Sequence, residues 1–543
     1  MVPEPLPGRR HTVAIGIAVF TAGAVLLGLE IAASRVLAPF FGNSLFVWGA
    51  LIGVVLAGLS VGYWAGGALA DRIPATRLLL AVLSLGALLV LAIPFVDGPV
   101  LEAVVGWNPG PRANPLVAAI ALFGLPSIVF ASVSPIAVRL LAVSVTHVGR
   151  TAGRLFAIST AGSIAGTFAT AFFLIPELGT DQLLGIAAAV LLAAVVLVAV
   201  VERLAAAAVL ALLATVGAGA AAWQLAPEAG GTLTGAAAEN WSPLYRQRGA
   251  VGAGVDHSSA GFRVVYRKDT RYHGLAVVDD HDSRYLRFDS SFQSGMYLNR
   301  PFATRYLYSD FFSLAKLYRP DARSMLFIGL GGGSAPKRLW RDHPELSIQV
   351  VEIDPVVVDV ARRYFAFPTS RRMPVAVEDG RRYLTDSDRR YDVIAIDAYY
   401  SDSIPFHLTT TEFVELVRSR LHPGGVLVSN VIGAIAGPSS RLFRSFYRTY
   451  RASFPTVLVH PVVEKGETTR GDYLRNLAFV ASESPAPSKA FLLQRWRALR
   501  AQRPGVPDLR RPIRNRYDRL IPTADVPTLT DDYAPTDSLL LVE

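Results

Sequence analysis

The chain begins with a series of long apolar stretches separated by short polar segments. As a helix, each stretch is long enough to cross roughly 30 Å of hydrocarbon, and a helix satisfies its own backbone hydrogen bonds in a bilayer. The pattern therefore predicts an all-α polytopic membrane bundle over residues 1–225. Its seven expected spans lie near 12–37, 46–69, 77–96, 116–143, 152–175, 181–201 and 204–223.

Small residues recur at helical spacing in the second expected span. Gly58, Gly62 and Gly66 are four positions apart and share one helix face. Such a face lets another helix approach closely. The pattern predicts helix packing at this face, either within the chain or between the two copies of a homodimer.

Two ionisable residues, Glu30 and Arg35, lie in the first expected span. A charge inside a membrane is costly and is a candidate for function. Glu30 is expected either to form an ion pair with another helix or to bind a cationic ligand. Arg35 lies near the helix end, from where its guanidinium can reach the membrane surface.

After the spans the pattern becomes that of a globular protein. Residues 226–260 are small and Gly-rich, which predicts a linker. Alternating apolar and polar positions follow in "FRVVYR", "HGLAVVDD" and "SRYLRFDS". They predict a small antiparallel β domain over 261–320.

From residue 321 to 543, apolar strands alternate with amphipathic helices. The strands are "MLFIGL", "IQVVEID", "PVAVEDG", "YDVIAIDAYY" and "GGVLVSNVI". Strand–helix alternation predicts a parallel sheet with right-handed crossovers. We therefore expect an α/β doubly wound, Rossmann-like nucleotide-binding domain.

Glycines and carboxylates mark one edge of that expected sheet. A glycine-rich loop between a strand and a helix can hold a nucleotide against free backbone N–H groups, and an acid at the end of the second strand can bind ribose hydroxyls. The carboxyl ends of parallel strands bind ligands in such folds. The candidate residues are Gly329, Gly331, Gly332, Gly333, Glu352, Asp379, Gly380 and Asp397.

Composition changes this picture little. The net charge is +10, but the arginines are scattered among acids without a basic run, so we predict no nucleic-acid partner. The chain has no cysteine, which excludes disulfides and thiolate metal sites. The sequence shows no convincing cluster of metal ligands, so no metal is predicted.

The motifs "GLGGGS", "VEID", "VEDG" and "YDVIAIDAY…IPFHLTTTEF…LHPGGVLVSN" resemble those of the spermidine synthases, or polyamine aminopropyltransferases. The resemblance covers roughly residues 262–480. The whole arrangement is similar to the membrane-bound bacterial form of this family. It implies transfer of an aminopropyl group from decarboxylated S-adenosylmethionine, as co-substrate, to a small amine, giving a polyamine such as spermidine and methylthioadenosine. It implies no prosthetic group.

The resemblance also assigns roles. Glu352 would hold the ribose hydroxyls, Asp379 and Gly380 the adenine, and Asp397 would act as general base. His273 falls where the family places a residue near the thioether and aminopropyl group. The expected substrate residues are Asp289, Gln293, Tyr308, Asp310, Ser334, Tyr400, Asp402 and Pro405.

Three positions depart from the family pattern on the acceptor side. Ser334 stands where the family usually has Asp, Ser309 where it has His, and Tyr400 where it has a second Asp. Asp310 and Asp402 are candidates to compensate for these replacements. The nucleoside side of the site is therefore better supported than putrescine as the acceptor.

Two other functions stay open. One is a transferase that uses S-adenosylmethionine itself, and the other is a polyamine transporter or sensor with a nucleoside-binding regulatory domain. The lipid bilayer is an expected partner, and we expect a multi-pass protein of the cell membrane. Arginines in alternate loops predict a cytoplasmic N-terminus. Seven spans would then place the C-terminal domain outside, whereas a cytosolic donor favours the cytoplasmic side.

Overall fold

The computed structural model divides the chain into two units. The first consists of Met1–Ala229 together with Arg267–Gly274, and the second of Gly230–Tyr266 together with Leu275–Glu543. The structure describes residues 8–41, 45–110, 112–142, 148–224, 232–233, 261–289, 291–400, 404–463, 471–536 and 539. The predicted linker, 226–260, lies outside the described residues except for 232–233, and so stays a prediction.

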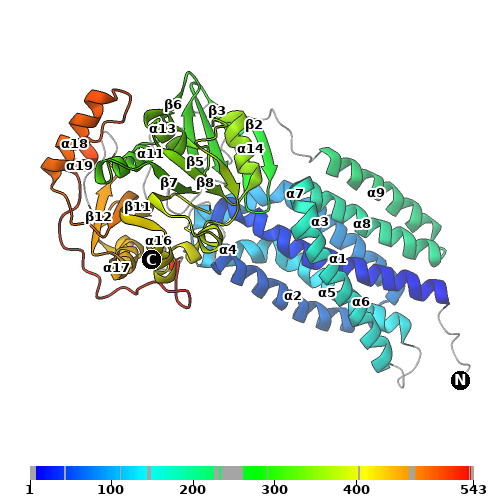
Figure 1. Cartoon of the computed structure of the whole chain (residues 1–543). Coiled ribbons are helices and arrows are strands. Elements are labelled where there is room, and N and C mark those ends of the chain that lie inside the picture. Colours follow the sequence, from blue (N-terminus) through cyan, green and yellow to red (C-terminus); the bar gives the residue numbers. More distant parts are fainter. Residues whose placement is uncertain are drawn as a thin grey trace, which may run out of the picture. The chain divides into compact units, whose positions relative to one another are not determined.

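Among the residues that the structure describes, the first unit contains seven helical segments that are long and apolar enough to cross a membrane (Figure 1). They confirm the predicted all-α architecture. The fourth and fifth each contain a π-helical stretch, η1 (Ile120–Gly124) and η3 (Thr170–Leu174). The helices are α1 (Arg9–Phe41), α2 (Leu45–Ala70), α3 (Ala75–Trp107), α4 (Ala113–Ala119), α5 (Leu125–Leu141), α6 (Val148–Ala169), α7 (Ile175–Leu178), α8 (Thr180–Val201) and α9 (Ala205–Gln224).

Glycines allow close helix packing within this unit. A Cβ atom on Gly62 would lie 2.3 Å from the carbonyl oxygen of Ile128, which is on α5. A Cβ atom on Gly166 would lie 2.0 Å from the carbonyl oxygen of Ala24, on α1. The glycine face of α2 is therefore used inside the chain, and a homodimer stays a prediction.

The segment Arg267–Gly274 is held by membrane helices of its own unit. Arg35 of α1 donates from Nη2 to the carbonyl oxygens of Thr270, at 3.2 Å, and Arg271, at 2.8 Å. Asp269 accepts hydrogen bonds from the backbone N–H and hydroxyl of Thr180, at 2.8 and 2.9 Å. Because Thr180 begins α8, Asp269 satisfies an N–H group at a helix start, where one has no partner within the helix. Glu30 is half-buried in α1, and its two expected roles stay predictions.

The second unit contains two sheets. The smaller is antiparallel in its paired strands, as predicted, with the order β1-β2-β3-β4-β5-β6. Its strands are β1 (Thr232–Leu233), β2 (Phe262–Asp269), β3 (Gly274–Asp280), β4 (Ser283–Phe288), β5 (Ser291–Tyr297) and β6 (Arg300–Thr304).

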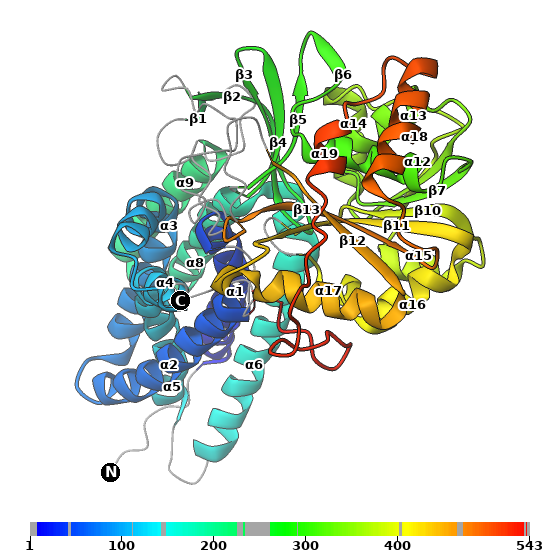
Figure 2. The ribbon, with the colours of Figure 1, turned by 90° about the vertical axis from the view of Figure 1, so that its left-hand side faces the viewer.

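The larger sheet has seven strands in the order β12-β13-β11-β10-β7-β8-β9 (Figure 2). The five strands from β9 to β11 pair in parallel, and β13 and β12 continue the sheet antiparallel. This confirms the doubly wound prediction. The strands are β7 (Ser324–Ile328), β8 (Ser347–Glu352), β9 (Val375–Val377), β10 (Tyr391–Ile396), β11 (Leu421–Gly433), β12 (Thr456–Pro461) and β13 (Arg475–Ser482).

Helices cover both faces of this sheet, so its central strands are apolar on both sides. In β7, Leu326 and Ile328 belong to one hydrophobic cluster, and Met325 and Phe327 to the other. This is the continuous apolar run expected of a buried parallel strand. The helices that matter for the site are α11 (Tyr308–Phe311), α13 (Ser334–Asp342), α14 (Pro355–Tyr364), α15 (Gly380–Asp386), α16 (Thr411–Ser419) and α17 (Arg441–Ser453).

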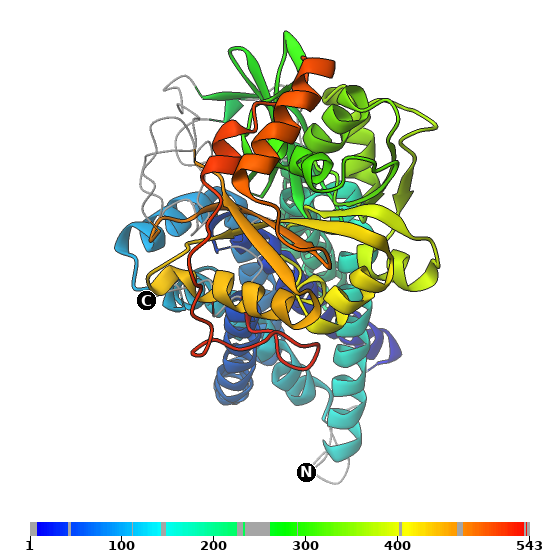
Figure 3. The same cartoon turned by 60° about the vertical axis from the view of Figure 1, so that its left-hand side comes forward.

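The C-terminal part of the chain returns to the sheet domain. After α18 (Lys489–Gln502) and α19 (Arg510–Arg514), it runs alongside α17 (Figure 3). Arg448 of α17 donates from Nη1 to the carbonyl oxygens of Thr523, at 2.9 Å, and Val526, at 2.6 Å. We refer to residues 521–536 as the C-terminal segment.

Candidate active site

The candidate site lies where the strand order of the large sheet reverses. Strands β7 and β10 are neighbours, but the chain proceeds from β7 to β8 on one side and from β10 to β11 on the other. The loops after β7 and β10 therefore meet at the carboxyl edge, the usual ligand site of such folds. Gly329 has φ +92°, and a Cβ there would lie 2.2 Å from the carbonyl oxygen of Asp397. Glycine permits this contact between the two loops.

The rest of the glycine loop is held from the small sheet. The backbone N–H of Gly332 donates to Oγ of Ser294 on β5, at 2.9 Å. The hydroxyl of Ser334, at the start of α13, donates to the carbonyl oxygen of Gly295, at 3.3 Å. A Cβ on Gly333, whose φ is +69°, would lie 2.4 Å from Cδ2 of Phe367. The loop is thus fixed by its neighbours and leads directly into a helix N-terminus.

Glu352 braces the glycine loop from the end of β8. Its Oε2 accepts from the backbone N–H of Leu330 at 2.8 Å, and its Oε1 accepts from that of Asp354 at 3.0 Å. Burial raises the pKa of the Glu352 carboxyl to about 6, and these backbone hydrogen bonds oppose the rise. The side chain therefore stabilises the glycine loop and the start of α14, and its contact with ribose hydroxyls stays a prediction.

Asp379 likewise has structural partners. Its Oδ1 accepts from the backbone N–H groups of Arg381 and Arg382, both at 3.0 Å, so it caps α15. Its Oδ2 is hydrogen-bonded to Nε2 of His407 at 2.9 Å. His407 lowers the pKa of the Asp379 carboxyl, with a smaller contribution from the helix cap. A Cβ on Gly380 would lie 2.4 Å from Cγ2 of Ile328, so this glycine lets α15 approach β7.

Asp397, the predicted general base, follows β10 directly. Its backbone N–H donates to the carbonyl oxygen of Ile328 at 2.8 Å, which fixes it beside the end of β7. Its Oδ1 accepts from Nδ2 of Asn430 at 3.0 Å. Burial raises the pKa of the Asp397 carboxyl to about 7, and the Asn430 hydrogen bond acts against this. A carboxylate with a pKa near 7 is well matched to proton transfer at neutral pH.

The predicted acceptor residues lie on several elements. Tyr308, at the start of α11, donates its hydroxyl to the carbonyl oxygen of Gln293 on β5, at 3.0 Å. Asp310 accepts from Oγ1 of Thr304 at 2.7 Å and forms an ion pair with Arg338 of α13 at 3.1 Å. Burial raises the pKa of Asp310, although Arg338 lowers it. Its charge is thus already compensated, and its acceptor role stays a prediction.

The remaining predicted residues that the structure describes lie beside strand ends, before a short helix or in the first unit. Asp289 follows β4 with φ +53°, Tyr400 follows β10, and Pro405 precedes the short helix Phe406–Leu408. Asp402 lies outside the described residues. His273 belongs to the first unit, where it is buried, and burial and then Arg35 lower its imidazole pKa to about 3. The roles predicted for these residues stay predictions.

Sequence reasoning missed three residues that hold the site together, namely Ser294, His407 and Asn430. Asn430 lies near the carboxyl end of β11, and its neighbour Ser429 pairs with Ile396, the last residue of β10. The strand-end rule that selected Asp397 would therefore have found Asn430 as well. Ser294 lies within β5 and His407 in the short helix Phe406–Leu408, and neither carries such a signal.

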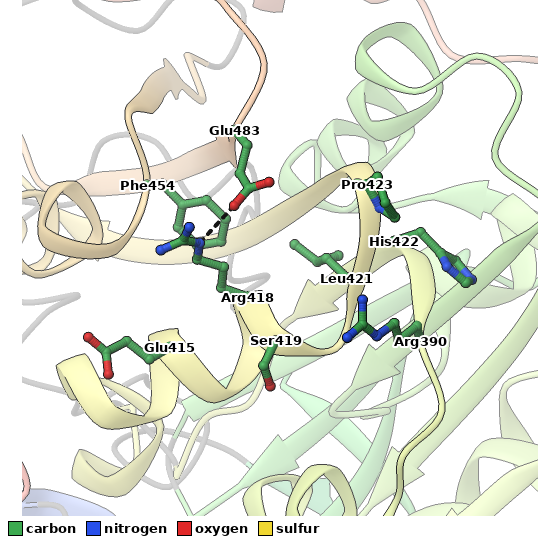
Figure 4. Close-up of a pocket in the computed structure, with 10 residues that line it drawn as sticks. Arg390, Glu415, Arg418, Ser419, Leu421, His422, Pro423, Phe454 and Glu483 are labelled. Carbon is green, nitrogen blue, oxygen red and sulfur yellow. Dashed lines mark hydrogen bonds and ion pairs between the residues drawn. The ribbon is translucent and has the colours of Figure 1, made fainter.

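A separate pocket lies at the opposite edge of the large sheet (Figure 4). Leu421, the first residue of β11, and Arg390, just before β10, line it, so it lies at the amino ends of parallel strands. Arg418 and Glu483 form an ion pair there at 2.8 Å. This pocket is not part of the candidate site.

The strand order and the position of the candidate site define the second unit as a doubly wound α/β domain. Residues 308–433 match the family model described as the spermine/spermidine synthase domain. The second unit therefore contains a spermidine synthase domain, as the motifs predicted.

Curated relatives match the chain over part of their length. A probable polyamine aminopropyl transferase of Bifidobacterium longum is 34% identical over 168 residues, which are 31% of this chain and 37% of that protein. A polyamine aminopropyltransferase of Vibrio vulnificus is 33% identical over 199 residues, 35% of this chain and 65% of that protein. An eEF1A lysine and N-terminal methyltransferase of Mus musculus is 32% identical over 149 residues, 26% of this chain and 21% of that protein. The chain thus spans less than two thirds of the length of each.

Proposed function

We propose that the protein is a membrane-anchored aminopropyltransferase that uses decarboxylated S-adenosylmethionine and a small amine. The observation that carries the proposal is the position of Asp397. Its carboxylate, with a pKa of about 7, lies beside the glycine loop, within the region that matches the spermidine synthase domain. A base and a nucleoside loop at one sheet edge are the two components that the reaction needs.

The proposed chemistry is a displacement at carbon. The amine attacks the propyl carbon bonded to the sulfonium sulfur, the new C–N bond forms, and the C–S bond breaks. The electron pair of that bond stays on sulfur, so methylthioadenosine leaves as a neutral thioether. A protonated amine has no lone pair with which to attack, so Asp397 must take a proton from it. Because Asn430 holds Oδ1, we assign the proton to Oδ2.

The donor's nucleoside part would rest on the glycine loop. Helix α13 begins directly after this loop, and the N–H groups at a helix start have no partner within the helix and can hold a ligand. Glu352 and Asp379 would bind the ribose and the adenine while keeping their structural hydrogen bonds, since each carboxylate oxygen can accept more than one.

The acceptor is proposed to differ from putrescine. At the family's acceptor positions this chain has the neutral residues Ser334, Ser309 and Tyr400, and the carboxylate of Asp310 is engaged by Arg338. An amine with a single cationic group suits this arrangement better than a diamine, because a second ammonium would need its own negative partner.

A second candidate is transfer from S-adenosylmethionine itself. The methyltransferase among the relatives favours it, and a glycine loop with an acid after the second strand serves either donor. The two reactions release different products, methylthioadenosine and S-adenosylhomocysteine, which a chromatographic assay separates.

The test is an assay of the purified full-length protein with each donor and a panel of mono- and diamines. Release of methylthioadenosine that depends on a monoamine is the expected result, and Asp397→Asn is the inactive control. Release of S-adenosylhomocysteine would favour the second candidate. If the protein bound a donor without turnover, the sensor hypothesis would replace both.

We also propose that the seven apolar helices place the protein in the cell membrane. The side of the second unit follows from a labelling experiment, because the chain has no cysteine and a single introduced one is unambiguous. Labelling of Asp388→Cys, an exposed position, in intact cells by a membrane-impermeant maleimide would place this unit outside. Labelling only after lysis would place it in the cytoplasm, where the donor is made.

A further inference from the structure

The C-terminal segment is attached to the candidate site through one carboxylate, that of Asp531. Its Oδ1 and Oδ2 accept from Nη1 and Nη2 of Arg381, at 2.7 and 2.6 Å. This parallel, two-bond arrangement fixes direction as well as distance. Oδ1 also accepts from the hydroxyl of Thr410 at 2.7 Å, and the backbone N–H of Asp531 donates to Glu412 at 3.1 Å. Four hydrogen bonds thus define the place of this residue.

Arg381 connects Asp531 to His407 and Asp379 at the candidate site. Its Nη1 also donates to the carbonyl oxygen of His407 at 3.0 Å, so the same guanidinium holds Asp531 and the backbone of His407. The imidazole of His407 is in turn bonded to Asp379 at 2.9 Å. Arg381 also follows Asp379 closely in the chain and donates its backbone N–H to that carboxylate. Each oxygen of Asp379 is therefore bonded to a residue of this network, Oδ1 to Arg381 and Oδ2 to His407.

We propose that Asp531 is a positioning residue for the nucleoside site, and that it fixes the carboxylate of Asp379 through Arg381 and His407. This inference rests on the proposed function, in which Asp379 contacts the adenine of the donor. It adds to the site a residue outside 308–433, the region that matches the family model.

The surroundings of Asp531 support a fixed position. Just before it, Leu529 is fully buried, and its carbonyl oxygen accepts from the backbone N–H of Thr411 at 2.9 Å. The backbone N–H of Leu529 donates to the hydroxyl of Thr449 at 3.0 Å. The segment is thus anchored to α16 and α17 immediately before it reaches Arg381. The hydrogen bonds from Arg381 lower the pKa of the Asp531 carboxyl, and Asp531 raises the pKa of the Arg381 guanidinium, as expected for a formed ion pair.

The chain offers a matched control in the same segment. Asp525 forms an ion pair with Arg444 of α17, and its side chain is even more exposed than that of Asp531. None of its contacts leads to His407 or Asp379. Asp525→Asn therefore removes a comparable surface ion pair of the C-terminal segment without disturbing the connection to the site.

The first measurement needs no ligand. Hydrogen exchange of the full-length protein reports how well the backbone N–H groups of Arg381 and Arg382 are protected. Both groups donate hydrogen bonds to Asp379. We expect Asp531→Asn to speed exchange in residues 379–386 and Asp525→Asn to leave it at the wild-type rate. Equal exchange in Asp531→Asn and the wild type would overturn the inference, whatever the protein's activity.

The second measurement is the affinity for methylthioadenosine, by calorimetry on the full-length protein. Substitutions outside a site that act on it through a network typically change its affinity modestly, and we expect Asp531→Asn to weaken binding by roughly 3- to 10-fold. The Asp525→Asn protein should bind as the wild type does. In an Asp379→Asn background, Asp531→Asn should add no further loss, because the residue through which it acts is already changed. An additive loss in the Asp379→Asn background, or an equal loss in Asp531→Asn and Asp525→Asn, would show that the segment only stabilises the fold.

The two hypotheses fail in different ways. A wild-type protein that does not bind methylthioadenosine would contradict the proposed function, while faster exchange in Asp531→Asn would still support the link to Asp379. Normal binding with unchanged exchange would retain the proposed function and reject the role of Asp531.

Discussion

The hydrogen bond from Asn430 to Asp397 sets the pH range in which the proposed enzyme works. Burial raises the pKa of Asp397 to about 7, and the Asn430 amide keeps it from rising further by stabilising the ionised form. Asn430→Leu removes this donor with little change in side-chain volume. The hydroxyl of Tyr399 donates to the backbone carbonyl of Asn430, so that contact survives the substitution.

The size of the effect follows from the hydrogen bond. A hydrogen bond to a charged group contributes about 1.5 kcal/mol at the lower end, and one pKa unit corresponds to about 1.4 kcal/mol. The Asp397 pKa should therefore rise by about one unit. Since the base acts in its ionised form, activity should appear about one pH unit higher. At pH 7 the ionised fraction would fall from about one half to about one tenth, roughly a fivefold loss of rate.

The assay is methylthioadenosine release between pH 5.5 and 9.5 with both substrates saturating. The Asn430→Leu profile should lie below the wild type near pH 7 and meet it near pH 9.5. Asp397→Asn provides the baseline, with a loss of about 10²- to 10⁴-fold and no rise around pH 7. A uniform loss for Asn430→Leu at every pH would refute the reasoning, because it would indicate damage to the site without a shift in the base.

Three further substitutions test other parts of the structure. Glu352→Gln leaves one of the N–H groups of Leu330 and Asp354 without its acceptor and should weaken nucleoside binding by about 1.5–3 kcal/mol; an unchanged dissociation constant in calorimetry would contradict this. Gly333→Ala places a Cβ against Phe367 at a residue whose φ of +69° disfavours alanine. Its melting temperature should fall well below that of Gly505→Ala, whose Cβ would be 3.6 Å from its nearest neighbour. Gly166→Ala would overlap the backbone of α1, whereas Gly153→Ala on the same helix meets no atom within 4 Å; equal melting of these two proteins in detergent would argue against close packing of α1 and α6.

The sequence was sufficient to predict features that depend on local pattern. Long apolar runs identified the seven helices, because a bilayer requires length and hydropathy alone. Five parallel strands and the glycine loop followed from strand–helix alternation. The final strands, β12 and β13, were not predicted. In the sequence they are short apolar runs, "TVLVHP" and "NLAFVAS", which could also belong to a buried helix.

Contacts between distant residues could not be predicted in the same way. The pairing of Asp531 with Arg381 joins positions 150 residues apart, and nothing in the local sequence of either residue specifies the partner. The pattern identified Asp379 as a strand-end carboxylate, but its bond to His407 joins it to a short helix 28 residues later in the chain. The ion pair between Arg338 and Asp310 could not be predicted for the same reason, since β6, α11 and α13 meet only in the folded domain.

The attachment of residues 267–274 to the membrane helices has a consequence for the evolution and dissection of the protein. The two units are not consecutive along the chain, since the eight residues Arg267–Gly274, from the end of β2 to the start of β3, belong to the first unit. A cut in the predicted linker would thus take these residues away from Arg35 and Thr180, and would leave the buried groups Thr270 and His273 exposed on the released fragment. The apolar helices and the spermidine synthase domain are therefore interleaved along the chain. A homologue that lost its spans would need a different sequence between these two strands.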